Sequence, residues 1–315
     1  MKVVRSLAEV SRDRKSVVTV GTFDGVHVAH SAILREAVSR ARAIGGRSVV
    51  VTFDPHPKEV VASRAEGVQL LSTVDERIEA IAALRVDLLL ILEFTFQFSR
   101  MSSRDFYKTY IVEGTGVSEV VVGYDHMFGR DREGSIKDLE RYGVEFGFGV
   151  VTVPPVSVDG VAVSSTKIRR ALADGDVALA TLYLGSPYQL SGKIIRGNGL
   201  GEKLGFPTAN IVPVSRTKVI PGRGVYAVGA RIGKEERFGM LNIGTRPTVS
   251  NDGVQSIEVH IFGVEGDLVG RDIVIRFLRR LRDEKRFDSV DELIAQLHKD
   301  KVEALSVAST YGPPA

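Results

Sequence analysis

The chain has 315 residues, of which 43% are hydrophobic and 26% are charged, and it contains no cysteine. The length predicts two domains, and the lack of cysteine excludes disulfides, thiolate zinc sites and thiol catalysis. The net charge is only +3, so the composition does not indicate a nucleic-acid partner. The sequence has no run of about 18 apolar residues, so no membrane span is predicted. The charged N-terminus is unlike a secretory signal. We therefore expect a cytoplasmic protein without a nucleic-acid or membrane partner, and a homo-oligomer stays open.

The first half of the chain alternates short apolar runs with helical patterns. The apolar runs predict strands buried on both faces, over residues 16–20, 48–53, 87–94, 119–124 and 149–153. The helical patterns cover residues 30–44, 73–84, 102–112 and 135–142. Thr73 with Glu76, and Ser102 with Asp105, are typical of capping boxes. The alternation predicts an α/β fold with a parallel, doubly wound sheet, whose ligand lies beyond the carboxyl ends of the strands.

The first candidate site follows the first of these strands, in VGTFDGVHVAH at residues 20–30. Gly21 and Gly25 permit a tight turn, and backbone amides at a helix start favour phosphate. Three-residue spacing allows His27 and His30 to point into one pocket. Neither a dinucleotide fingerprint nor a Walker A loop is present. On spacing alone, a polar helix start without chemistry explains the histidines equally well; a metal site is weaker, because no third ligand lies nearby.

Three further polar segments follow predicted strands, at residues 52–57, 123–134 and 164–172. Carboxyl ends of parallel strands share one edge of the sheet, so these segments are expected on the same rim as the histidines. The last one offers hydroxyls, Lys167 and Arg169 near a helix start, which is a second phosphate-binding arrangement.

After about residue 186 the pattern changes to frequent glycines and short alternating segments. These predict an antiparallel sheet or small barrel, with strands over residues 188–195, 224–232, 237–244, 256–263 and 272–281. A helix over residues 289–307 closes the chain, capped by Ser289 with Glu292 at the box position. Residues 185–190 are the predicted linker, so the predicted domains are 1–186 and 187–315, and the tail is expected to be loose.

The second candidate site is a glycine-rich segment, residues 191–210, that ends in Pro207-Thr208-Ala209-Asn210. Its backbone amides suit phosphates, and its side-chain oxygens suit a divalent cation. Glu258 alternates with apolar residues and is expected to face away from their side of the strand. A flexible surface turn and a solvated strand glutamate are the corresponding explanations without chemistry.

These motifs together resemble a known family. GTFDGVHVAH and SSTKIR (residues 164–169) resemble the phosphate motifs of HIGH-type nucleotidyltransferases. With FDPHP (53–57) and residues 123–134, the first half resembles the FMN adenylyltransferase part of bacterial bifunctional riboflavin kinase/FAD synthetases. GFPTAN (205–210) and IEVHIFG (257–263) resemble their kinase part. The resemblance implies a Rossmann-like HIGH nucleotidyltransferase domain with a parallel sheet, then a small antiparallel β-barrel riboflavin kinase domain with a C-terminal helix.

For the adenylyltransferase, the resemblance implies that His27 and His30 are catalytic and contact the ATP phosphates. For Asp24, a bracing role in the turn, through bonds to backbone amides, is favoured over a phosphate contact. Positions Thr22, Ala29 and His126 depart from the family pattern. The implied ATP and phosphate contacts are Gly21, Phe23, Asp24, Gly25, His27, His30, Ser164, Ser165, Thr166 and Arg169. The implied flavin-side residues are Asp125, His126 and Phe128.

For the kinase, the resemblance implies that Glu258 is the catalytic base and that Thr208 and Asn210 hold Mg²⁺. The implied ATP and phosphate contacts are Gly197, Gly199, Gly205, Pro207, Thr208 and Asn210. The implied function is phosphorylation of riboflavin by ATP to FMN, then adenylylation of FMN by a second ATP to FAD and pyrophosphate. Two alternatives remain: an FMN adenylyltransferase with a weakened kinase domain, and a non-catalytic flavin or nucleotide sensor.

Overall fold

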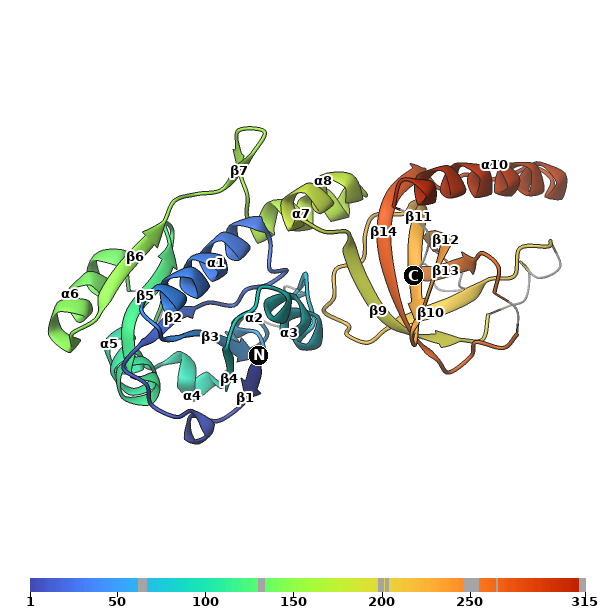
Figure 1. The fold of residues 1–315 in the computed structure, drawn as a ribbon. Coiled ribbons are helices and arrows are strands. Elements are labelled where there is room, and N and C mark those ends of the chain that lie inside the picture. The colour runs from blue at the N-terminus through green and yellow to red at the C-terminus, as the bar shows by residue number, and fades with distance from the viewer. Residues whose placement is uncertain are drawn as a thin grey trace. The chain divides into compact units, whose positions relative to one another are not determined.

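A computed structural model of the chain describes residues 1–61, 67–129, 134–197, 201, 204–245, 255–264 and 266–311. The predicted loose tail, residues 312–315, lies outside them. Contacts divide the chain into two compact units, Met1–Ser165 and Thr166–Ala315. Figure 1 shows a sheet flanked by helices in the first unit, and a barrel with a long helix in the second. Among the described helices, none has the length and apolar character needed to cross a membrane.

The first unit is built on a six-stranded parallel sheet, with strand order β1-β4-β3-β2-β5-β6. The strands are β1 (Lys2–Val4), β2 (Ser16–Val20), β3 (Arg47–Asp54), β4 (Leu88–Glu93), β5 (Val117–Gly123) and β6 (Gly149–Val153). All five predicted strands and the parallel pairing are confirmed. β1 was not predicted, because this edge strand has only three residues and two of them are exposed.

Helices cover both faces of this sheet (Figure 1). On one face, α1 (Val28–Ala43) and α3 (Val74–Ala83) bury Leu34 and Ile81 against Val50 of β3. The opposite face carries α5 (Ser103–Phe106), the π-helix η2 (Tyr107–Thr115) and α6 (Ile136–Phe146). Successive strand residues point to opposite faces, so burial on both sides explains why these strands are apolar throughout.

The predicted helix starts are present. Thr73 and Glu76 form the capping box of α3. Ser102 accepts the N–H of Asp105, but the Asp105 carboxylate accepts the Ser102 hydroxyl rather than the Ser102 backbone, so this second capping box is incomplete. Short elements outside the prediction are η1 (Leu7–Glu9), α2 (Pro57–Val61), α4 (Phe96–Ser99), and the hairpin of β7 (Ser157–Val158) and β8 (Val161–Ala162).

The second unit contains a closed antiparallel barrel of six strands, in the order β10-β13-β12-β11-β14-β9. They are β9 (Tyr188–Ile195), β10 (Ala209–Pro213), β11 (Gly224–Ile232), β12 (Glu235–Thr245), β13 (Gln255–Ile261) and β14 (Asp272–Arg282). β9 closes the barrel because it pairs with both β10 and β14. The last three residues of the predicted linker, 188–190, belong to β9, where Tyr188 is buried.

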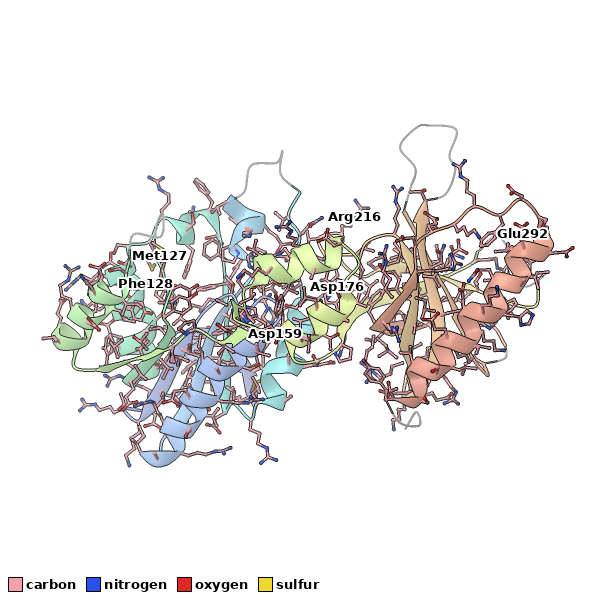
Figure 2. All side chains as sticks on the ribbon, turned by 90° about the horizontal axis from the view of Figure 1, so that it is seen from above. Met127, Phe128, Asp159, Asp176, Arg216 and Glu292 are labelled. Atoms are coloured by element: carbon pink, nitrogen blue, oxygen red, sulfur yellow. The ribbon has the colours of Figure 1, made fainter. Side chains whose placement is uncertain are left out.

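Helix α10 (Val290–Ser309) packs on the outside of this barrel, where Ala304 and Val307 meet Met240 of β12. Ser289 caps it by accepting the N–H of Glu292, as predicted; Glu292 is labelled on this helix in Figure 2. An ion pair between Asp300 of α10 and Arg282 of β14, with the nearest atoms 2.8 Å apart, joins the helix to this strand.

Two helices precede the barrel, α7 (Ser165–Ala173) and α8 (Val177–Leu184), which Asp176 caps (Figure 2). α8 packs against β9 and β14, and the N–H of Gly222 donates to the Leu172 carbonyl at 2.8 Å. Both helices therefore group with the barrel by contact, and the boundary at residue 186 stays a prediction.

Candidate functional site

The first unit has a cavity of about 180 Å³ at the carboxyl ends of β2, β5 and β6. From β2 the chain continues to β3 on one side, while β5 pairs on the other, so the cavity lies at a topological switch point. Five of the predicted residues line it: His27, His30, Asp125, Ser164 and Ser165. Ala29, one of the departures from the family pattern, lines it as well.

The turn between β2 and α1 is held by a buried aromatic ring. Phe23 is 2% exposed and has a positive φ of 47°, as has Val26 at 39°. The Phe23 ring packs against Gly21, because a Cβ added at Gly21 would lie 3.0 Å from the ring. Gly25 has φ 84° and donates its N–H to the Ser72 hydroxyl at 3.0 Å. Gly21, Phe23 and Gly25 thus shape the turn and do not line the cavity.

Asp24 braces the same turn. It is 2% exposed, and its Oδ1 accepts the backbone N–H groups of Leu71 at 2.9 Å and Ser72 at 3.0 Å. Its carbonyl oxygen accepts the Ser165 hydroxyl at 3.1 Å. This geometry favours the bracing role over a direct phosphate contact.

The two histidines stack. Their ring centroids are 3.6 Å apart with an interplanar angle of 13°. His27 Nδ1 accepts the backbone N–H of His30 at 3.3 Å and so caps α1, which places the proton of a neutral His27 on Nε2. His30 Nδ1 is buried and makes no hydrogen bond within the described part of the chain. Burial holds the pKa of His30 well below its ordinary value, and electrostatic repulsion from His27 and Arg77 lowers it further. The ring is therefore neutral at pH 7.

Arg77 was missed by the sequence reasoning. It lies on α3, is 3% exposed, and its Nη1 donates to the Thr22 carbonyl at 2.9 Å and to the Phe53 carbonyl and Thr52 hydroxyl at 3.0 Å each. It therefore ties the β2–α1 turn to the end of β3. An arginine four residues before Ile81, on the buried face of the predicted helix, was the available signal.

The predicted flavin-side residues separate. Asp125 lines the cavity, whereas His126 and Phe128 do not. The His126 ring stacks on Phe128 at 5.2 Å, and its Nε2 lies 3.4 Å from the Tyr107 hydroxyl. Phe128 belongs to the hydrophobic core, whereas its neighbour Met127 is exposed; both are labelled in Figure 2. Burial lowers the pKa of His126 to about 4, against an opposing effect of Asp125.

The remaining predicted residues of this site follow on α7. Thr166 is exposed and Arg169 half-buried, and both fall beyond the division at Ser165. The sequence reasoning also missed the apolar wall of the cavity. Two prolines directly after a predicted strand were its sequence signal. This wall consists of Ile33, Val153, Pro154, Pro155 and Val163.

In the second unit, strand register brings the predicted residues together. Glu258 on β13 pairs with Asn210 on β10 and with Asn242 on β12. Directly paired residues carry their side chains on one face, about 5 Å apart. Ile257 and Val259 are 3% and 1% exposed and point the other way, as predicted. Asn242 was missed, because only the pairing of β12 with β13 places it beside Glu258.

The glycine-rich segment approaches these side chains closely. A Cβ at Gly197 would come within 2.2 Å of the Asn210 amide nitrogen, so that side chain would have to move. A Cβ at Gly201 would come within 2.3 Å of the Phe206 carbonyl oxygen and 3.0 Å of Thr208 Oγ1, so glycine is required there. Gly205 has φ 78°. The Thr208 side chain is exposed and Asn210 is 4% exposed. Gly199 lies outside the described residues.

The carbonyl of Pro207 accepts a hydrogen bond from His260 Nδ1 at 2.8 Å. His260 is 8% exposed and lies two residues after Glu258 on β13.

Comparison with known proteins gives concordant results. Residues 9–167 match the family model of FAD synthetase, and residues 184–308 match that of riboflavin kinase. A bifunctional riboflavin kinase/FMN adenylyltransferase of Listeria monocytogenes is 38% identical over 92% of this chain and 91% of its own. The protein of the same description from Escherichia coli K12 is also 38% identical, over 96% and 97%. A crystal structure described as a macrolide-efflux protein from Streptococcus pneumoniae superimposes with TM-score 0.86 and 32% identity, covering 95% and 97%.

Proposed function

The chain belongs to the bifunctional riboflavin kinase/FMN adenylyltransferase family, and we propose how its residues divide the two reactions. The segment matching FAD synthetase converts FMN and ATP to FAD, and the segment matching riboflavin kinase converts riboflavin and ATP to FMN. The observation that carries the residue assignment is the gathering of predicted side chains into one group per unit. These groups are the lining of the cavity after β2, and the row Asn210–Glu258–Asn242.

In the adenylyltransferase, an FMN phosphate oxygen attacks the α-phosphorus of ATP, and the bond to the β-phosphate oxygen breaks to release pyrophosphate. Negative charge builds up on the oxygens around the α-phosphorus and on the leaving group, where positioned N–H and O–H donors stabilise it. We assign this role to His27 and His30, with Ser164, Ser165, Thr166 and Arg169 on the pyrophosphate side. The amides at the start of α1 add to it.

The electrostatics of this pair suit a donor role. His30 is neutral before ATP binds, so its ring offers one N–H rather than a full positive charge. Phosphate oxygens near an imidazole favour its charged form, so ATP opposes the lowering of its pKa. Asp125 and the apolar wall, which includes Ile33 and Pro154, are assigned to substrate positioning.

In the kinase, the ribityl 5′-hydroxyl of riboflavin attacks the γ-phosphorus of ATP, and ADP leaves. We assign Glu258 as the base that takes the hydroxyl proton. Glu258 is half-buried, and the strand register places Asn210 on one side of it and Asn242 on the other. Gly197 and Gly205 belong to the segment assigned to the ATP phosphates.

We also propose a Mg²⁺ ion held by Thr208 and Asn210. Among the residues described, no group of three or more His, Asp or Glu side chains could hold a metal ion. Hydroxyl and amide oxygens are hard ligands, and Mg²⁺ typically takes few of them together with substrate phosphates and water. When bound, the ion neutralises charge on the transferred phosphate. The close approach of Gly197 and Gly201 to these two side chains fits such a cradle.

The test is incubation of the purified chain with riboflavin and Mg-ATP, followed by chromatographic separation of the flavins. Formation of both FMN and FAD would show both activities. FAD formed only from supplied FMN would support the adenylyltransferase with a weakened kinase. The absence of both products would support a sensor.

The proposed protein is cytoplasmic and acts on small-molecule substrates without a nucleic-acid partner. Its domain boundary lies near residue 186, and its oligomeric state stays open.

A further inference from the structure

One hydrogen bond in the second unit joins the two segments that carry the proposed kinase residues. His260 Nδ1 lies 2.8 Å from the Pro207 carbonyl oxygen. A carbonyl only accepts, so the imidazole is the donor and its proton is on Nδ1. Pro207 directly precedes Thr208, and His260 follows Glu258 by two residues, on the same face of β13.

The surroundings of His260 hold it in this geometry. Its ring meets the edge of Phe206 at 5.4 Å and of Phe262 at 5.5 Å. Phe206 is itself fixed, because it is 4% exposed and its N–H donates to the Gly201 carbonyl at 2.8 Å. Burial and the Lys301 ammonium lower the pKa of His260, while the bond to Pro207 opposes them, so the ring is a neutral, single-proton donor at pH 7.

The register explains why this bond matters. Ala209 pairs with Val259 and Asn210 with Glu258, so β10 begins just after Thr208 and cannot fix that residue through the ladder. The Pro207 carbonyl is the backbone group next to Thr208, and His260 holds it from the strand of the proposed base. We propose that His260 is a positioning residue of the kinase, which sets the Thr208 hydroxyl in place relative to the Glu258 carboxylate. This inference rests on the proposed roles of Thr208 and Glu258.

The test compares two replacements in the full chain. His260→Phe keeps an aromatic ring but removes the donor, and we expect kcat/KM for Mg-ATP in FMN formation to fall roughly tenfold or more, with the KM for riboflavin within twofold. His260→Asn keeps an N–H near the position of Nδ1 and should recover most of the loss. FAD formation from FMN, measured in the same samples, should stay unchanged.

His298→Phe is the matched control, because exposed His298 on α10 contacts the same Phe206 ring at 5.1 Å. It should leave both activities unchanged. Should His260→Phe unfold the barrel, as circular dichroism would show, the smaller His260→Leu takes its place with the same expectation. Kinase activity within twofold of wild type in the folded variant would overturn the proposal, as would equal loss in His260→Asn. Thr208→Ala separates the two levels: if it leaves FMN formation intact, the proposed kinase site itself fails.

Discussion

His27 and His30 lie face to face, with ring centroids 3.6 Å apart, at the first turn of α1. Two imidazolium rings at this distance repel each other, so the pair does not carry two protons near neutral pH. His27 Nδ1 accepts the backbone N–H of His30 and so caps the helix, and this hydrogen bond orients the ring. The helix cap and the proposed phosphate donor are therefore the same residue.

Replacing both His27 and His30 by alanine should abolish FAD formation and leave FMN formation nearly intact. The pair lines the cavity of the first unit, whereas the proposed kinase residues belong to the second. We expect FAD synthesis to fall by roughly 10² or more, the scale for lost donors at a charged transition state. Chromatography of products from FMN and from riboflavin measures both, and the kinase rate serves as the control. Unchanged FAD synthesis in the folded double variant would refute the phosphate-binding role.

Arg77→Met should reduce FAD synthesis and destabilise the first unit. It removes the Arg77 donor from the Phe53 carbonyl and the Thr52 hydroxyl, at a cost of about 1–3 kcal/mol for each group left unsatisfied. The Thr22 carbonyl keeps the Thr52 hydroxyl as a donor. The turn that carries His27 loses its tie to β3, so kcat should fall roughly tenfold. Thermal unfolding and FAD formation are the readouts. Arg85→Met, an exposed arginine just after α3, is the control, and equal effects of the two variants would contradict the prediction.

Glu258→Gln keeps the size of the side chain and removes the base. Kinase turnover should fall by roughly 10² or more, while Mg-ATP binding persists, because the metal is assigned to Thr208 and Asn210. Turnover and nucleotide binding are measured separately, by product chromatography and calorimetry. Glu235→Gln, at the exposed start of β12, should change neither. Near wild-type FMN production by Glu258→Gln would contradict the role of Glu258 as the base and would support a solvated strand glutamate without a catalytic role.

Two fragments test the boundary and the independence of the kinase. Residues 187–315 hold all six barrel strands, and residues 166–315 add α7 and α8. Both should fold, phosphorylate riboflavin and make no FAD, because His27 and His30 are absent. The longer fragment should melt higher, since Val177 and Ala180 of α8 are fully buried. If only the longer one folds, the boundary lies near residue 166; if folded fragments make no FMN, the division into two sites is wrong.

His126 should make the chain less stable in mild acid. Its pKa is about 4 in the folded protein against 6.5 ordinarily, so between these values the unfolded chain binds the extra proton. Stability from this residue is complete above pH 6.5 and is lost as the pH falls toward 4. At pH 5 the loss is at most about 2 kcal/mol. Thermal unfolding at pH 7 and 5 should show a smaller acid shift in His126→Phe than in wild type, and equal shifts would count against it.

Local signals in the sequence were predictive, and relationships between distant segments were not. β9 and β11 begin and end where the alternating patterns do, and Thr73 with Glu76 forms its box, because each depends on neighbours in the chain. β10 was missed, since its five residues begin inside the glycine-rich segment, residues 191–210, which was interpreted as a loop. Arg77 and His260 bind backbone carbonyls, which carry no residue type for a pattern to reveal.

The closure of the barrel through β9 has a consequence during protein synthesis. β14 is the last of the six barrel strands to be synthesised, and it must pair with both β9 and β11 before the barrel is closed. The six strands of the parallel sheet, by contrast, are all made by residue Val153. The nascent chain thus finishes one sheet while the other is still an open ribbon with exposed edges, a state that favours aggregation. A stop codon between Val153 and the start of β14 at Asp272 would yield a truncated product that keeps every strand of the parallel sheet and has no closed barrel.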